Sequence, residues 1–248
     1  MRPSRLLLFV ILCWAGVPVA AQDMAAKQHA IAIFRNAAER YKSNRELHFN
    51  MRYRYAAEDK PTVWLDSLKG DFAVYGDRYR YRLDSTEFVG GKDLSVILFK
   101  QDQVMYLAKP GADTRNINPM ALLDSLLLKD DSVGCRIMET KDWQTIILSF
   151  HPAKKTKRIE YVVDRHTGFI TKMVNVVSAR ELYDPSVQQK VANDATYAIV
   201  ETDLSGYRET NVMKEEWDLG RLFKKEGKEY IPQPPYQSYK IFLGSPDL

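Results

Sequence analysis

The chain has 248 residues, of which 45% are hydrophobic and 27% are charged, and its formal net charge is +4. Binding of a nucleic-acid backbone needs a concentrated positive field, so this nearly balanced charge excludes nucleic acid as a partner. The length is sufficient for a sizeable core, built as one large all-β domain or as two small domains.

The first residues have the pattern of a secretory signal peptide. Arg2 and Arg5 precede an apolar run over residues 6–15, and the small residues Val19 and Ala21 fit the positions before a cleavage site. The apolar run is shorter than the roughly 20 residues that a membrane-spanning helix needs. We therefore predict an exported protein.

Removal of residues 1–21 leaves residues 22–248, which we predict to form a single domain. Cys135 is then the only thiol, so an intramolecular disulfide is excluded. Two arginines leave with the signal, so 36 Lys and Arg become 34 against 32 Asp and Glu, and the net charge falls to about +2.

A helix and a long strand open this domain. Residues 24–42 carry apolar side chains at the three-and-four spacing of an amphipathic helix, among them Ile33, Phe34 and Tyr41. From residue 47 to residue 55 the period changes to two, because apolar residues occupy the odd positions and polar residues the even ones. A period of two predicts a half-buried strand.

The stretch GDRYRYRLDSTEF continues this alternation. Tyr79, Tyr81 and Leu83 point one way from the predicted strand, and the arginines between them point the other way. The preceding strand, SLKGDFAVY, places Leu68, Phe72 and Val74 on one face. We expect the arginine face to be solvated, with the arginine stems lying along the sheet.

Further strands follow at short intervals between turn signals. They are predicted at residues 94–99, 103–108, 134–140, 143–151, 158–164, 169–177 and 196–204. The loop before Phe169 ends in Gly168, which can adopt a positive φ in a hairpin turn. Short strands joined by tight turns favour an antiparallel meander, so the predicted fold class is mainly β with helices (α+β).

One Leu-rich helix interrupts the strands. The segment NPMALLDSLLLKD begins with a proline suited to a first helical turn, and its apolar side chains form one broad stripe. We predict that this helix is a lid over the open side of the curved sheet. The lid residues are Met120, Leu122, Leu123, Leu126 and Leu127.

The alternating aromatic and Met side chains have two interpretations. They are the core of a sheet packed on the first helix, or they line a cavity under the lid that holds an acyl chain. Burial of an acyl chain contributes about 0.8 kcal/mol per methylene, and tyrosine can reach a polar headgroup while its ring stays apolar. The cavity candidates are Phe49, Met51, Tyr53, Tyr55, Phe72, Val74, Tyr79, Tyr81 and Leu83.

The order of these elements resembles the outer-membrane lipoprotein carrier family (LolA-like proteins). The matching segments are AAERYKS, LKGDFAVYGDRYRYRL, NPMALLDSL and IEYVVDRHTGFITKM, whereas residues 179–248 match poorly. The resemblance implies a half-open antiparallel β-barrel closed by the N-terminal helix and the lid helix. It also implies a periplasmic carrier, in a Gram-negative envelope, that buries lipid or the acyl chains of a lipoprotein.

The expected partners are therefore a lipid or acylated lipoprotein and membrane-bound loading and receiving proteins, with the carrier itself a monomer. The family's arginine at the end of the second strand falls near Gly76, and its W-x-Y motif is replaced by LSVILF. An envelope sensor or protein-interaction module on the same fold is kept as the alternative function.

No catalytic chemistry is predicted. The sequence has no phosphate loop, zinc-binding His pair, nucleophile elbow or Cys-x-x-Cys pair. Asp164 and His166 are better explained as residues that bound a hairpin loop than as a catalytic pair, and Cys135 is better explained as a buried, inert thiol. We expect no enzymatic activity, no cofactor and no metal site.

Overall fold

The computed structural model describes residues 19–44, 46–76, 78–109, 127–128, 130, 132–151, 154–182, 197–209, 217–245 and 248. The helical segments are α1 (Val19–Ser43) and two 3-10 turns, η1 (Ala179–Glu181) and η3 (Leu219–Arg221). The strands are β1 (Glu46–Ala57), β2 (Trp64–Tyr75), β3 (Arg78–Leu83), β4 (Thr86–Gly90), β5 (Ser95–Phe99), β6 (Val104–Ala108), β7 (Gly134–Glu139), β8 (Trp143–Ser149), β9 (Thr156–Asp164), β10 (Ile170–Ser178), β11 (Tyr197–Glu209), β12 (Phe223–Glu226), β13 (Glu229–Pro232) and β14 (Lys240–Leu243).

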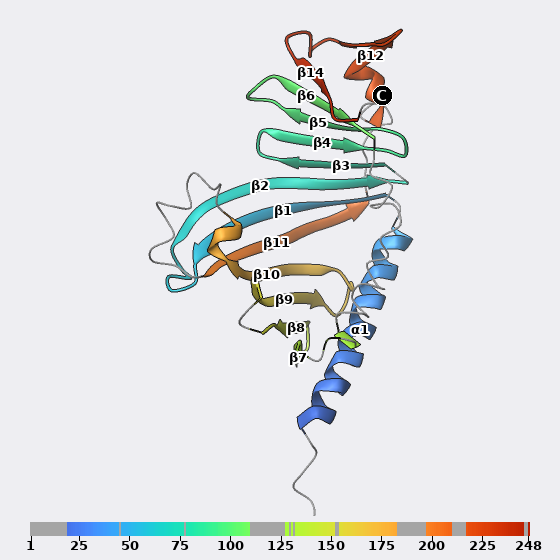
Figure 1. Cartoon of the computed structure of the whole chain (residues 1–248). Coiled ribbons are helices and arrows are strands. Elements are labelled where there is room, and N and C mark those ends of the chain that lie inside the picture. The colour runs from blue at the N-terminus through green and yellow to red at the C-terminus, as the bar shows by residue number, and fades with distance from the viewer. Residues whose placement is uncertain are drawn as a thin grey trace, which may run out of the picture.

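One large sheet dominates the described part of the chain. Its 12 strands lie in the order β14-β6-β5-β4-β3-β2-β1-β11-β10-β9-β8-β7, and β12 and β13 form a separate hairpin. Neighbouring strands are antiparallel, except that β14 runs parallel to β6. The end strands β14 and β7 are not paired with each other, and Figure 1 shows the sheet curling without closing. The predicted mainly β fold with an open antiparallel sheet is confirmed.

Strand alternation gives this sheet two different faces. Phe49, Phe72 and Tyr81 lie directly opposite one another on β1, β2 and β3, so they share what we name the aromatic face. The intervening residues, such as Arg52 and Arg82, lie on the opposite face, which we name the charged face. The period-two pattern of the sequence therefore identifies both faces correctly.

Helix α1 packs on the aromatic face at the β7 end of the sheet. Ile33 and Phe34 belong to one buried core with Ile146 and Leu148 of β8, and the Phe34 ring meets Tyr161 of β9 edge-on at 4.9 Å. Figure 1 shows the helix running beside this end of the sheet. None of the helical segments that the structure describes is both long enough and apolar enough to span a bilayer.

In the described part of the chain, the C-terminal strands β11 and β14 are built into the large sheet. Strand β11 lies in the middle of the sheet between β1 and β10, and β14 extends its far edge. Leu222 and Phe223 form a second buried core with Leu98 and Leu107, which lie on the charged face. The segment from Trp217 to β13, which we name the covering segment, therefore covers the charged face over β3, β5 and β6.

This covering segment makes one sequence expectation wrong at Arg80, whereas Arg78 is exposed as expected. The arginine face was expected to be solvated, but Arg80 is only 4% exposed. Its guanidinium lies 5.7 Å from the centre of the Trp217 ring, and Arg78 Nη1 donates to the Trp217 carbonyl at 3.5 Å. Arg80 is buried because Trp217, which is distant in sequence, packs on the strand.

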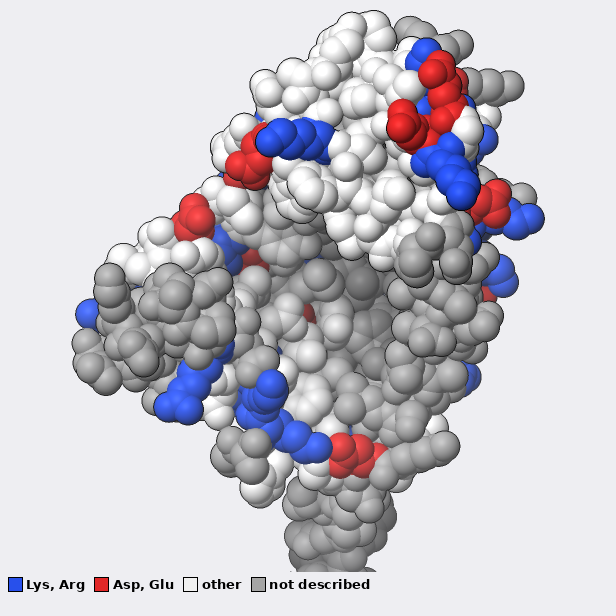
Figure 2. All heavy atoms as spheres, turned by 45° about the horizontal axis from the view of Figure 1, so that its top comes forward, with Lys and Arg blue, Asp and Glu red and all other residues white. Residues whose placement is uncertain are grey.

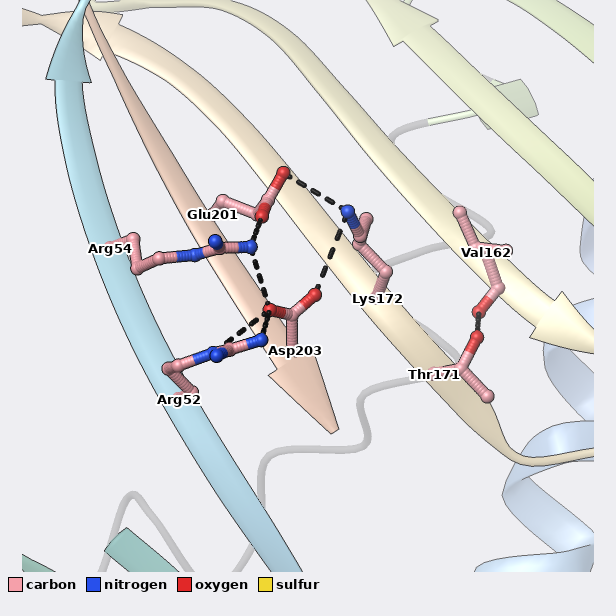
Figure 3. A network of polar contacts seen from close by, with 7 residues as sticks. All are labelled: Arg52, Arg54, Val162, Thr171, Lys172, Glu201 and Asp203. Atoms are coloured by element: carbon pink, nitrogen blue, oxygen red, sulfur yellow. Dashed lines mark hydrogen bonds and ion pairs between the residues drawn. The ribbon is translucent and has the colours of Figure 1, made fainter. Parts of the chain in front are cut away.

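Away from that segment, the charged face is held by ion pairs between strands. Asp203 of β11 accepts hydrogen bonds from Arg52 at 3.1 Å and from Arg54 at 2.9 Å, and it lies 3.6 Å from the Lys172 ammonium (Figure 3). Glu201 bonds both Arg54 and Lys172. Paired charges let this face meet water without a covering layer.

We expect Asp203→Asn to lower the free energy of unfolding by about 1–2 kcal/mol, because one carboxylate serves three cations in a partly buried network. Urea denaturation measures this change. The matched control is Asp142→Asn, since Asp142 is 56% exposed and pairs with His166 in a loop; its expected effect is below about 0.5 kcal/mol. Equal effects of the two variants would contradict a cooperative network on the charged face.

Candidate functional site

A hollow of about 350 Å³ lies on the aromatic face, and it is the candidate site. Its walls come from β1, β2, β3 and β11, together with the residue after η1. The lining residues are Tyr53, Arg54, Tyr55, Asp66, Ser67, Leu68, Tyr81, Leu83, Leu182 and Val200. The space-filling view in Figure 2 shows a hollowed face on which most of the charged side chains in view lie around the hollow.

Arg54 and Ser67 contribute strand backbone to this wall. They lie opposite each other and alternate with the lining side chains, so their own side chains point to the charged face. The Arg54 guanidinium is indeed held there by Glu201 and Asp203. The side chains that face the hollow are therefore almost all apolar or aromatic.

Four of the nine predicted cavity residues are brought together in this hollow. They are Tyr53, Tyr55, Tyr81 and Leu83, and each is half-buried. Asp66 and Leu182 are exposed, so they mark its mouth. Leu182 is 40% exposed, so an apolar side chain contacts solvent at the entrance of the hollow.

Three other predicted cavity residues belong to a continuous row of rings beside the hollow. Phe72 stacks with Phe49 at 5.2 Å and with Tyr79 at 6.4 Å between ring centres. Phe49 in turn meets Tyr207 at 5.0 Å, and Tyr207 stacks on Phe169 at 4.3 Å. The protein's own rings therefore fill this part of the aromatic face.

The two remaining cavity candidates do not line the hollow. Met51 is buried with Leu47 and Leu204 in the core under the ring row. Val74 is half-buried and lies opposite Leu47 and Tyr79 in the sheet. For these positions the geometry matches the core interpretation of the sequence pattern.

The predicted lid falls mostly outside the described residues, as do Met120, Leu122, Leu123 and Leu126. Leu127 is described, and it is fully buried with Ile33 of α1 and Ile146 of β8. This position lies in the core between α1 and the β7 end of the sheet, away from the residues that line the hollow.

Two tyrosine pairs supply polar groups on the aromatic face. Tyr81 hydrogen-bonds to the side chain of Tyr53 inside the hollow, and burial raises the pKa of Tyr81. Beside the hollow, the Tyr41 and Tyr207 hydroxyls lie 2.8 Å apart, and Tyr207 donates to the Ile170 carbonyl at 2.5 Å. Burial raises the pKa of Tyr41 and Tyr207 as well, so Tyr41, Tyr81 and Tyr207 stay protonated near neutral pH.

Several residues of the site were not among the cavity residues predicted from the sequence. The sequence pattern places Leu68 on the same face as Phe72 but does not name it as a cavity residue, and extending that pattern toward the first residue of β2 reaches Asp66. Val200 and Leu182 lie far along the chain, and the register that brings Val200 opposite Tyr55 has no local signal. Tyr207 and Phe169 were missed for the same reason.

The polar groups weighed for chemistry have structural roles. Asp164 Oδ1 accepts the backbone N–H groups of His166 at 2.7 Å and Thr167 at 2.9 Å, and these bonds lower the pKa of Asp164. Gly168 closes the same hairpin at φ 76°, as expected. Burial raises the pKa of the Cys135 thiol to about 11, so it is a poor nucleophile near neutral pH.

Within the described ranges, no three His, Cys, Asp or Glu side chains gather where a metal ion could bind. The side chains that face the hollow offer hydroxyl groups, one carboxylate and hydrocarbon. Such a lining binds apolar groups by burial, with a few hydrogen bonds to fix orientation.

Comparisons with known proteins found likeness only in structure. No protein-family model and no curated protein sequence matches this chain. A conserved, uncharacterised protein from Thermus thermophilus aligns with a TM-score of 0.44 and 8% identity, over 84% of this chain and 98% of that one. A LolA superfamily protein from Nitrosomonas europaea aligns with a TM-score of 0.34 and 9% identity, over 75% and 96%.

The MucA/MucB complex of Pseudomonas aeruginosa contains a chain that aligns with a TM-score of 0.40 and 15% identity, over 75% of this chain and 60% of that one. At these identities and TM-scores the likeness is one of fold and carries no argument about what this chain binds. The LolA superfamily is also the group that the order of the sequence elements resembles.

Proposed function

We propose that this chain is an exported binding protein that carries a lipid acyl chain in the hollow of its aromatic face. The observation that carries the proposal is the hollow itself, about 350 Å³ in volume and lined by Tyr53, Tyr81, Leu68 and Leu83 in a sheet whose other face holds the charges. Binding and release need no covalent step.

The energetics favour a hydrocarbon ligand. Each buried methylene contributes about 0.8 kcal/mol, so a segment of about six methylenes contributes about 5 kcal/mol before ordering costs. The volume is at the lower end of the range for ligand pockets, so it suits one acyl chain or the inner part of one. Leu182 at the mouth extends the apolar surface for the rest of the chain.

The cellular setting follows from the signal-like N-terminus. We propose that the protein acts as a monomer in the periplasm of a Gram-negative envelope. It would receive its lipid or acylated lipoprotein from one membrane-bound partner and pass it to another.

A test starts from protein purified without denaturation from the periplasm of its host. We expect mass spectrometry of a solvent extract to find acyl species in stoichiometric amount, and the delipidated protein to take up a neutral fluorescent acyl probe. Absence of both bound lipid and probe uptake would rule out the carrier function.

A second candidate is a protein-interaction module, and one observation favours it. Phe242, Tyr106 and Ile97 continue the apolar row of the aromatic face out to the edge strand β14, directly opposite one another. Phe242 is 51% exposed, which suits a contact with an apolar segment of a partner. A partner retained by lipid-free protein and lost on Phe242→Ala would support this candidate over lipid carriage.

A further inference from the structure

We propose that the hollow selects acyl chains whose polar end is uncharged, such as an ester or an amide, over chains that end in a carboxylate or a phosphate. This inference rests on the proposed function, because it concerns ligands of the same hollow. It is carried by the distribution of charge between the two faces of the sheet.

The register places every Arg and Lys of β1, β2 and β3 on the charged face. These residues are Arg52, Arg54, Lys69, Arg78, Arg80 and Arg82. The same strands contribute six of the side chains in the hollow: five are aromatic or aliphatic, and the sixth is the carboxylate of Asp66. Recognition of a carboxylate or phosphate relies on Arg, Lys or clustered N–H groups, which this wall does not present among the described residues.

Arg54 is the one cation among the described residues that line the hollow, and it is already neutralised. Its guanidinium bonds Glu201 and Asp203 on the charged face (Figure 3). It also lies 4.4 Å from the centre of the Trp64 ring. Turning it toward the hollow would leave two partly buried carboxylates with less compensation, which is unfavourable. An anionic headgroup therefore gains no partner from Arg54.

The charged side chain that lines the mouth of the hollow is a carboxylate. Asp66 lies opposite Tyr55 on the aromatic face, lines the hollow and is exposed. One of its oxygens accepts the Ser67 N–H at 2.7 Å, which fixes the carboxylate beside the entrance. A second anion at this entrance is repelled, whereas an amine is attracted.

The polar group inside the hollow suits an uncharged acceptor. In the Tyr53–Tyr81 pair one hydroxyl donates to the other, so the second O–H is left to donate to a ligand. An ester or amide carbonyl can accept this bond without bringing a charge into the apolar wall. The hollow therefore combines a donor for a neutral carbonyl with a carboxylate that repels anions.

The experiment compares three ligands with the same 12-carbon chain, namely methyl laurate, laurate and dodecylamine, below their aggregation limits at pH 8. Each displaces a neutral fluorescent acyl probe from the full mature chain. We expect methyl laurate to compete at a concentration about tenfold or more below that of laurate, since the carboxylate must lose hydration without gaining a partner.

Apolar surfaces in general prefer an ester to a carboxylate, so variants provide the specific test. Asp66→Asn is expected to raise the affinity for laurate about threefold, to lower the affinity for dodecylamine about threefold and to leave the affinity for methyl laurate unchanged. Asp59→Asn is the matched control, because Asp59 is exposed in the turn before β2 and does not line the hollow. Asp59→Asn should leave the affinity for all three ligands unchanged.

The double variant Tyr53→Phe/Tyr81→Phe tests the hydroxyl pair, because either hydroxyl alone could still donate to a ligand. It should weaken binding of methyl laurate several-fold while leaving binding of dodecane, which has no polar end, unchanged. Laurate competing as well as methyl laurate, or Asp66→Asn shifting all three ligands alike, would overturn the inference while lipid carriage stands. Failure of the probe and of all the ligands to bind would overturn both proposals.

Discussion

Leu68→Asp is expected to weaken uptake of an acyl probe about 50-fold without unfolding the protein. Leu68 lies opposite Tyr53 on the aromatic face and lines the hollow, but it belongs to none of the buried core clusters among the described residues. A carboxylate there holds water, so about three methylenes of the ligand lose their apolar contacts. At about 0.8 kcal/mol each, that loss corresponds to this change in affinity.

The control for this prediction lies three residues away in the same strand. Leu65 is 54% exposed and does not line the hollow, so Leu65→Asp should leave probe uptake within about twofold of wild type. Titration with a neutral acyl probe measures both variants, and circular dichroism checks that each is folded. Equal losses in the two variants would place binding elsewhere on the protein.

The faces of the sheet could be predicted from the sequence because they depend on a local rule. Alternation in β1 and β3 separates Tyr53 and Tyr81 from Arg52 and Arg82 whatever the strands pair with. The same rule explains why four predicted residues meet in one hollow. It cannot say which part of a face stays open.

The filled part of the aromatic face depends on contacts between distant segments. Phe49 and Phe72 share their face with Tyr53, but Tyr207 and Phe169 approach only at one end. Those two residues come from strands and loops far along the chain from β1 and β2. The period-two pattern alone therefore could not distinguish residues of the core from residues that line the hollow.

The C-terminal region shows the other limit of sequence reasoning. Strands β12, β13 and β14 are short, with four residues each, and were not predicted. β14 pairs with β6 although the two strands are far apart in sequence, and a parallel pair has no hairpin signal. Arg80 is buried beneath Trp217 by another contact between distant segments of the chain, so the strand pattern of GDRYRYRL could not reveal it.

Leu222→Ala is expected to lower the free energy of unfolding by about 2–5 kcal/mol. Leu222 is fully buried against Val96, Leu98 and Met105, so the truncation leaves a cavity between η3 and the charged face. This is a large share of the roughly 5–15 kcal/mol that stabilises a typical protein. Urea denaturation followed by tryptophan fluorescence measures it, since Trp217 lies in the same covering segment.

The same variant tests whether the charged face stabilises the fold without contributing to acyl-probe binding. Because Leu222 packs on the charged face, Leu222→Ala should leave acyl-probe affinity within about twofold in conditions where the protein stays folded, whereas Leu68→Asp should show the reverse pattern. Leu243→Ala is the matched control for stability, since Leu243 is 49% exposed, and it should cost less than about 1 kcal/mol. If Leu222→Ala lowered the free energy of unfolding no more than Leu243→Ala does, the covering segment would not be packed on the sheet. If it abolished probe uptake in the folded state, that segment would belong to the binding site.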